Sequence, residues 1–252
     1  MDKTLSVVLL IWIDNNSRSK RKWYRDLGNS LDSLDQQTVK ADEIIVVNAG
    51  PSKGNTARIK EVVEKHDTVT HIEVPTPKFS MSWGFNVGVK QAKSEYIMAV
   101  GYEMIPSPRA IESVKALMRP DLHLAGCCGW LSRDADLSDP IANWDKLRAP
   151  LENKMGRKNC FGTTSGTIQV MHRDQWHRLR GYNEDFPFYG AGAGLVVRAK
   201  LGGIKSIFVS CRDAMWLHPW HKHSRLVFAS PSPYKFAESP VVCNPDGWGE
   251  VE

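Results

Sequence analysis

The sequence predicts an α/β fold in which a mostly parallel central sheet carries helices on both faces. Along the first half of the chain, short apolar runs alternate with segments whose apolar residues recur at helical spacing. Such alternation is typical of parallel strands joined by helices. The apolar runs are nearly continuous, as expected for strands covered on both faces. The chain has 252 residues, 42% of them hydrophobic, which is sufficient for one sizeable core.

The elements of the first half follow from these patterns in order. Leu5–Trp12 is a near-continuous apolar run and is predicted to be a buried strand. We do not expect it to be a signal peptide, because Asp14 follows it in place of a small-residue cleavage site. Lys22–Asp35 is predicted to be an amphipathic helix with its apolar residues on one face. The other expected elements are strands at Glu43–Val47, His71–Val74 and Tyr96–Val100, a helix around Ile59–Val63, and a helix that Ser82 caps, with Phe85, Val89 and Ala92 on one face.

The second half is less regular. A helix is predicted at Pro108–Met118 and a strand at Leu124–Trp130, whereas Leu131–Asn159 shows no clean period and is predicted to be irregular. The remaining elements are a strand within Thr163–Met171, a short helix at Arg173–Leu179 ended by Gly181, a helix at Leu195–Leu201 and a strand at Ile204–Val209. The tail from Phe228 onward is rich in Pro and Ser and is expected to wrap the surface. We find no repeat or long linker, and therefore expect one domain with two halves.

Composition excludes several classes of protein. The five cysteines are odd in number and lack CxxC spacing, which favours reduced thiols and a cytoplasmic location over zinc or disulfides. No apolar run reaches the roughly 18 residues of a membrane span. The formal charge is +5, and five basic residues lie between Arg18 and Arg25. That run fits either a solvated loop and helix start or a contact with phosphate or a membrane surface. No nucleic-acid partner is expected, since no aromatic-and-basic surface motif is present.

Several ordered segments resemble the motifs of family 2 glycosyltransferases of the GT-A fold. They are SVVLLIWIDN with NSLDSLDQQT and DEIIVVNAG, then FSMSWGFNVGVKQAKSEYIMAV followed by MIPSP, and finally GTIQVMHRDQWHRLRGYNEDFPFYGAGAGLVVRAKLGG. The resemblance runs from about Leu5 to about His221. It implies a nucleotide-diphosphate sugar donor bound at the carboxyl ends of the strands, a divalent cation (Mn or Mg) on the diphosphate, and a glycan, lipid or protein acceptor. It also implies a nucleotide-binding half at about 1–105, an acceptor half at about 106–227 and an irregular tail at 228–252.

The chain departs from this family at three acidic sites. The family's D-x-D motif after the fourth strand is replaced by Gly101, Tyr102 and Glu103. The paired aspartates after the second strand are replaced by Asn48 and Ala49. The acidic residues at the start of a later helix correspond, by alignment back from Arg198, to Ala191, Gly192 and Gly194. We therefore expect a transferase-like protein with impaired activity; the alternative is a non-catalytic GT-A domain that binds a glycan or serves as an assembly module.

The resemblance also implies candidate site residues. Contacts with the nucleotide sugar are expected from Trp12, Asn48, Asn86, Lys90, Tyr102 and Glu103. The candidate metal ligands are Glu103 and His218, and the two side chains are expected to approach each other. The candidate relocated catalytic bases are Glu184 and Asp185.

Most of these residues also have a structural interpretation. Glu184 could be a turn or helix-capping carboxylate, and Asn86 could be a buried amide that bonds backbone. Lys90 could be an exposed helix lysine. The segment LHPWHKH, which holds His218, His221 and His223, could be an aromatic-rich surface turn together with Trp216 and Trp220. Some tryptophans could line an acceptor groove or serve as core and loop anchors, among them Trp130, Trp144, Trp216, Trp220 and Trp248.

Overall fold

The computed structural model describes residues 3–13, 23–76, 80–155, 168–186, 190–209, 214–220 and 240–251. Several sequence-based expectations lie outside these residues. They concern residues 18–22 of the basic run, His221 and His223, the first part of the strand expected within Thr163–Met171, and most of the tail from Phe228.

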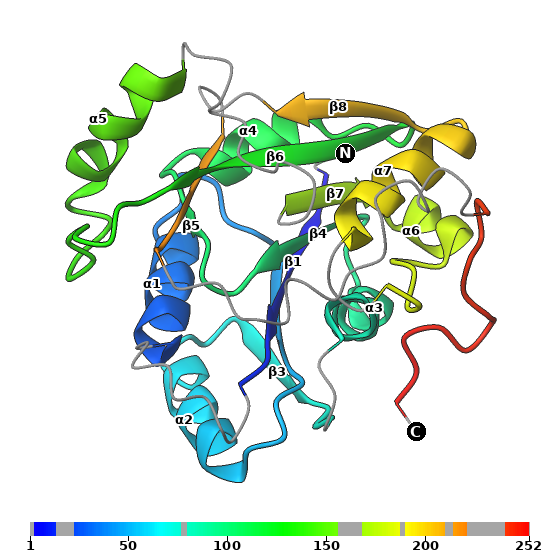
Figure 1. Ribbon diagram of the computed structural model, residues 1–252, viewed down its shortest axis with the longest axis horizontal. Coiled ribbons are helices and arrows are strands. Elements are labelled where there is room, and N and C mark those ends of the chain that lie inside the picture. The colour runs from blue at the N-terminus through cyan, green and yellow to red at the C-terminus, as the bar shows by residue number, and fades with distance from the viewer. Residues whose placement is uncertain are drawn as a thin grey trace.

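The described strands form one mixed sheet in the order β3-β2-β1-β4-β7-β6-β9-β5, with β8 paired to β6 (Figure 1). The strands are β1 (Leu5–Ile11), β2 (Glu43–Asn48), β3 (Val69–Glu73), β4 (Tyr96–Gly101), β5 (Ile105–Pro106), β6 (Leu122–Trp130), β7 (Ile168–His172), β8 (Lys205–Val209) and β9 (Met215–His218). The first four strands in the order are parallel to one another. β7 runs antiparallel to both of its neighbours. The predicted placement of β2, β1 and β4 side by side is confirmed.

The helices cover both faces of this sheet. They are α1 (Trp23–Asp35), α2 (Lys53–Val63), α3 (Met81–Gln91), α4 (Ala110–Leu117), α5 (Trp144–Met155), α6 (Arg173–Leu179) and α7 (Ala191–Leu201). Figure 1 shows α1 and α2 on one side of the parallel strands and α3, α6 and α7 on the other. Within the described residues, no helix has the length and apolar character that crossing a membrane requires.

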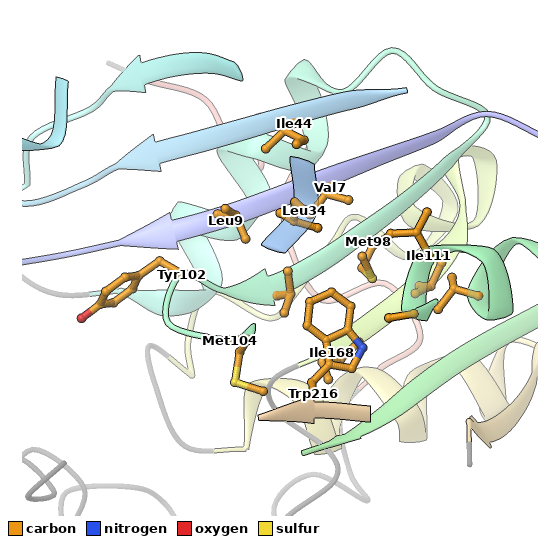
Figure 2. Packing of buried hydrophobic residues seen from close by; sticks show 14 of the residues in the cluster. Val7, Leu9, Leu34, Ile44, Met98, Tyr102, Met104, Ile111, Ile168 and Trp216 are labelled. Carbon is orange, nitrogen blue, oxygen red and sulfur yellow. The ribbon is translucent and has the colours of Figure 1, made fainter. Parts of the chain in front are cut away.

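Two hydrophobic cores follow from the period of two along β1. Val7 and Leu9 pack with residues of α1, α2 and α4, whereas Val8 and Leu10 pack with residues of α3, α6 and α7. Figure 2 shows the first core, in which Leu34 of α1, Ile111 of α4 and Trp216 of β9 surround the central strands. A third, smaller cluster joins α5 to β9 through Leu147, Leu151 and Leu217. Strands β1, β2 and β4 are buried on both faces, which explains their continuous apolar runs.

The described part of the tail is a C-terminal segment, residues 240–251, that packs into the fold rather than wrapping it loosely. Trp248 is 4% exposed and belongs to the second core. The Nδ2 group of Asn244 donates to the carbonyl oxygens of Arg180 at 2.6 Å and Tyr182 at 2.5 Å. The indole Nε1 of Trp83 in α3 donates to the carbonyl oxygen of Glu250 at 3.1 Å. The segment therefore ties α3 to the turn that follows α6.

Some expected boundaries are wrong. Residues 144–155 of the stretch predicted to be irregular form α5, and α7 begins at Ala191 rather than Leu195. The N-cap of α3 is Ser80, whose hydroxyl accepts from the backbone N–H of Trp83. Ser82, the predicted cap, instead donates to the carbonyl oxygen of Phe186 at 2.6 Å. In α3 the serine two positions earlier has the extended backbone that an N-cap requires.

Candidate functional site

The carboxyl ends of β1, β2 and β4 lie at one edge of the sheet and carry four of the predicted site residues. Ile11 pairs with Asn48, and Leu10 pairs with Gly101. Trp12 directly follows β1, and Tyr102 and Glu103 directly follow β4. Because parallel strands end at the same edge, these side chains share one rim of the sheet.

Glu103 meets His218 at this rim. The Oε1 atom of Glu103 lies 3.3 Å from Nε2 of His218, and both side chains are largely buried. The contact follows from the topology, because β5 pairs antiparallel with β9 and sets Ile105 opposite Leu217. Counting back along that register brings Glu103 to the end of β9. The expected approach of the two side chains is observed, and their role as metal ligands stays a prediction.

His218 is therefore not part of a surface turn. It ends strand β9, and Trp216 in the same strand is fully buried in the first core, as Figure 2 shows. The predicted interpretation of this segment as an aromatic-rich surface turn is wrong for both residues. Trp220 alone among the described residues of that segment fits it, since its side chain is exposed.

A hydrogen bond fixes which nitrogen of His218 faces Glu103. The Nδ1 atom lies 2.8 Å from the carbonyl oxygen of Pro219, and a carbonyl can only accept, so Nδ1 carries a hydrogen. In the neutral ring, Nε2 then presents its lone pair toward the Glu103 carboxylate. Two acceptors at 3.3 Å repel each other unless a proton or a metal cation lies between them. The arrangement matches that of histidines whose second nitrogen is held by a carbonyl while the first binds a metal.

Trp130 packs directly on the His218 side of this pair. Its ring stacks on the His218 ring with centroids 3.8 Å apart and an interplanar angle of 28°. The parallel pairing of β6 and β9 sets Trp130 opposite His218, and the backbone N–H of Leu131 donates to the His218 carbonyl oxygen. Stacking and the Pro219 contact together fix the ring orientation of His218. From the sequence alone, Trp130 cannot be told apart from the other candidate tryptophans. Its stacking on His218 could not be predicted, because strand β9 is not evident from the sequence.

The loops after β1 and β2 are held by Asn48 and Trp12. Asn48 is 1% exposed; its Nδ2 donates to Thr56 Oγ1 at 3.0 Å, and its Oδ1 accepts from the backbone N–H of Gly50 at 3.2 Å. The indole Nε1 of Trp12 donates to the carbonyl oxygen of Thr76 at 3.4 Å. A side chain at Gly50 would collide with the backbone of Ile13 at 2.8 Å. These contacts shape the rim, and direct contact of either side chain with a nucleotide stays a prediction.

Tyr102 and Lys90 occupy different surroundings. Tyr102 is 9% exposed and packs in the first core beside the rim (Figure 2). Lys90 lies in the last turn of α3, which leads into the start of β4 and therefore reaches the edge of the sheet opposite Glu103. Its Nζ atom lies 5.1 Å from the centroid of the Trp248 ring and 4.0 Å from Glu250 Oε1. The structure does not bring Lys90 to the rim.

Asn86 and Glu184 form a second polar cluster, closed by the C-terminal segment. Asn86 is fully buried, and its Nδ2 donates to the Tyr182 carbonyl oxygen at 2.9 Å and to Glu184 Oε1 at 2.7 Å. The same Glu184 oxygen accepts from the backbone N–H of Gly249 at 2.9 Å. Both residues therefore have the contacts of their structural interpretation, a buried amide and a turn carboxylate. Of the two candidate catalytic bases, Glu184 and Asp185, only Asp185 is exposed to solvent.

The start of α7 carries no acidic side chain in its first turn. Ala191, Gly192 and Gly194 are all buried there. Within the described ranges, no group of three or more His, Cys, Asp or Glu side chains could hold a metal. A cation held by Glu103 and His218 would therefore have only these two side-chain ligands from the described residues.

A pocket of about 380 Å³ opens beside Trp130, one of the tryptophans that could line an acceptor groove, and its wall formed by α5 was not predicted. It lies between the end of β6 and α5, where Leu131, Leu147 and Leu151 contribute apolar lining. The apolar spacing of Trp144, Leu147 and Leu151 is a helical signal that could have revealed this wall.

Comparison with known proteins gives a consistent family and fold. Residues 20–184 match the family model described as glycosyl transferase family 2. The mannosyltransferase PcManGT from Pyrobaculum calidifontis, in complex with GDP-Man and Mn²⁺, superimposes with a TM-score of 0.61 at 16% identity, over 90% of this chain and 60% of that chain. TarS from S. aureus gives 0.59 at 14%, over 86% and 37%. GalNAc-T7 with UDP, GalNAc and Mn²⁺ gives 0.60 at 14%, over 92% and 46%. The chain spans 60% or less of each of these chains, and curated protein sequences gave no significant match.

Proposed function

The chain belongs to glycosyl transferase family 2 and has the GT-A fold, and from this we propose that it binds a nucleotide-diphosphate sugar at the rim formed by β1, β2 and β4. The binding site would include Trp12, Asn48 and Tyr102, with a divalent cation held by Glu103 and His218. Support comes from PcManGT and GalNAc-T7, whose structures contain Mn²⁺ together with GDP-Man or UDP.

The observation that carries the proposal is the Glu103–His218 pair. Its imidazole nitrogen and carboxylate oxygen, 3.3 Å apart at the carboxyl end of the sheet, are both ligand types that divalent cations take in proteins. A bound cation would neutralise charge on the diphosphate leaving group. Because the described residues offer two ligands, the remaining positions would be filled by diphosphate oxygens and water.

We further propose that sugar transfer is impaired. An inverting transfer needs a carboxylate that accepts the acceptor's proton, and the first turn of α7 has none. Glu184 is engaged by Asn86 and Gly249, so Asp185 is the better candidate for a relocated base. The acceptor would be a glycan, a lipid or a protein. The absence of an acidic residue from the first turn of α7 also favours a second candidate function, that of a non-catalytic glycan-binding or assembly module.

A cytoplasmic location completes the proposal. It rests on the cysteines, whose number and spacing do not fit a disulfide framework. Cys128 and Cys243 are both free thiols in the structure.

The first test is metal-dependent donor binding. UDP- and GDP-sugars would be titrated calorimetrically with Mn²⁺ and with EDTA, using the wild-type protein, Glu103→Gln and the exposed control Glu61→Gln. We expect Mn²⁺-dependent binding in wild type and control, and a loss of at least about tenfold in Glu103→Gln, because one of two protein ligands loses its charge. Binding that is unchanged by EDTA, or by the Glu103 substitution, would refute the proposed cation site.

Turnover separates the two candidate functions. Loss of a general base costs on the order of a hundred- to ten-thousand-fold in rate, so donor binding should be accompanied by slow or absent transfer. Turnover at ordinary family rates would contradict impairment. Asp185→Asn and Glu184→Gln would then show which carboxylate accepts the proton.

A further inference from the structure

The pocket beside Trp130 is built from two different parts of the chain. Its floor is apolar, since Leu131, Leu147 and Leu151 belong to the third core cluster together with Leu217 of β9. Its polar lining comes from Ser132 and Asp136, from Asn143 just before α5, and from Lys146 in the first turn of α5. A pocket of about 380 Å³ is within the usual size range of small-ligand sites.

Trp130 connects this pocket to the proposed donor site. The indole lines the pocket and also stacks on His218, whose Nε2 lies 3.3 Å from Glu103. A ligand in the pocket is therefore separated from the proposed cation site by one aromatic ring and one imidazole. Transfer requires the reacting atoms to come within about 3–3.5 Å of each other, so a saccharide in this pocket would be a unit of the acceptor next to the one that reacts.

The polar lining is mixed in charge. Asp136 contributes one carboxylate, Lys146 one ammonium group, and Asn143 an amide whose Oδ1 lies 3.4 Å from Lys146 Nζ. Asp136 is held in place by the backbone N–H and hydroxyl of Ser138, at 3.0 and 2.6 Å. Opposite charges balance, so the lining favours a neutral ligand with many hydroxyl groups over a phosphate or a fatty chain.

A second aromatic ring stands nearby. Trp220, two residues beyond His218, is 47% exposed, and the Arg133 guanidinium lies 5.4 Å from its ring centroid. Arg133 adjoins Ser132 of the pocket lining. Aromatic faces provide flat apolar surface that packs against the C–H face of a pyranose ring.

We propose that this pocket is an acceptor subsite beside the reacting position and that it takes a neutral saccharide unit. The proposal rests on the proposed donor function for its role in transfer, but saccharide binding itself does not depend on a donor. Trp130 supplies the aromatic surface, and Asp136, Asn143 and Lys146 supply the hydrogen bonds to sugar hydroxyls.

Saccharide binding can be measured without any transfer reaction. Saturation-transfer NMR on the full chain would use methyl glycosides of glucose, galactose, mannose and N-acetylglucosamine and their disaccharides, with inorganic phosphate added as an anionic competitor. The variants are Asn143→Leu and Lys146→Met, with Lys200→Met on the exposed side of α7 as a matched control. We expect at least one saccharide to bind, phosphate not to displace it, and each pocket variant to lose about fivefold or more in affinity for it.

The outcomes distinguish this inference from the donor proposal. Loss of saccharide affinity in both pocket variants, with Lys200→Met and Mn²⁺-dependent UDP binding unchanged, supports the subsite. If nucleotide binds but no saccharide does, or if the pocket variants bind saccharide as wild type does, the subsite is refuted and the donor proposal stands. If saccharide binds in this pattern while no nucleotide binds, the subsite stands and the donor proposal fails.

Discussion

Gly101 occupies the position from which a second carboxylate could reach the Glu103–His218 pair. A Cβ atom at Gly101 would lie 3.3 Å from Glu103 Oε2 and 3.5 Å from its Cδ atom. The backbone of Gly101 lies in strand β4, outside the positive-φ glycines, so an ordinary side chain is tolerated. The contact is tight but involves the end of a side chain that can move by a few tenths of an ångström.

Gly101→Asp should strengthen cation binding. A second carboxylate beside Glu103 adds charge and an oxygen ligand, and we expect Mn²⁺ to bind about tenfold more tightly. Isothermal titration with Mn²⁺ in the presence of UDP would measure this. Gly101→Asn is the matched control, because it has the same shape without the charge. If Gly101→Asp and Gly101→Asn gained the same affinity for Mn²⁺, the proposed cation site at Glu103 and His218 would be contradicted.

At the residue scale, the family resemblance predicts the approach of Glu103 and His218, because similar enzymes hold a metal at these positions. The contacts made by the C-terminal segment could not be predicted. The partners of Glu184 were not expected, because Gly249 lies 65 positions further along the chain in a segment without periodic pattern. Nothing in the local sequence distinguishes a carboxylate held by a distant backbone N–H from one that is free to act as a base.

Helix α3 approaches the sheet unusually closely through two glycines. A Cβ atom at Gly88 would lie 2.3 Å from Val8 Cγ1 and 2.9 Å from Val47 Cγ2, and one at Gly84 would lie 2.5 Å from Leu10 Cδ1. These valines and leucine belong to the second core. The absence of side chains therefore sets the distance between α3 and strands β1 and β2.

Gly88→Ala should destabilise the protein although alanine is the better helix former. Overpacking against Val8 and Val47 costs about 1–3 kcal/mol, which exceeds the roughly 1 kcal/mol gained in helix propensity. Gly54 in α2 is the matched control, because nothing lies within 4 Å of its Cβ position. Gly54→Ala should stabilise by about 0.5 kcal/mol. Urea unfolding of both variants measures the difference, and a stabilised Gly88→Ala would refute the close packing.

The sequence predicts strands most reliably where both faces of the strand are buried. Strands β1, β2 and β4 have continuous apolar runs because helices cover both of their faces. Helix α5 was missed because Pro150 and its many polar residues hide a one-sided apolar spacing. Strand β9 was missed because it has only four residues and Pro219 follows it.

At the scale of the whole molecule, a buried histidine joins three strands of the second half. His123 of β6 is fully buried, with Nε2 donating to the Gln169 side-chain oxygen in β7 and Nδ1 accepting from the Ser206 hydroxyl in β8 at 3.0 Å. Burial lowers the pKa of His123 to about 4 from the ordinary value of 6.5, although the bond to Gln169 acts in the opposite direction. The ring is therefore neutral in the folded protein at physiological pH.

Acid should consequently destabilise the fold through His123. Between pH 6.5 and about 4 the unfolded chain binds a proton at this site that the folded protein does not, so the free energy of unfolding falls as pH falls. The loss amounts to roughly 3 kcal/mol across that range. Burial also lowers the pKa values of His71 and His177, so other residues contribute in the same direction.

A variant isolates the share of His123. His123→Asn should be less stable than wild type at pH 7, because Gln169 and Ser206 lose a partner, and the difference should shrink as pH falls toward 4.5. Urea unfolding at several pH values would show converging curves. Parallel curves would mean that His123 does not titrate as its burial implies.

During translation, the contacts made by the C-terminal segment can form only at the end of synthesis. Trp83 of α3 and its partner Glu250 are separated by 167 positions, which a ribosome needs roughly ten to thirty seconds to translate. Throughout that interval Asn86 lacks the neighbouring backbone of Gly249, and the apolar surface that Trp248 covers faces water or a chaperone. The nascent protein can form β1 to β4 early, but it closes the second core only after residues 240–251 have left the ribosome.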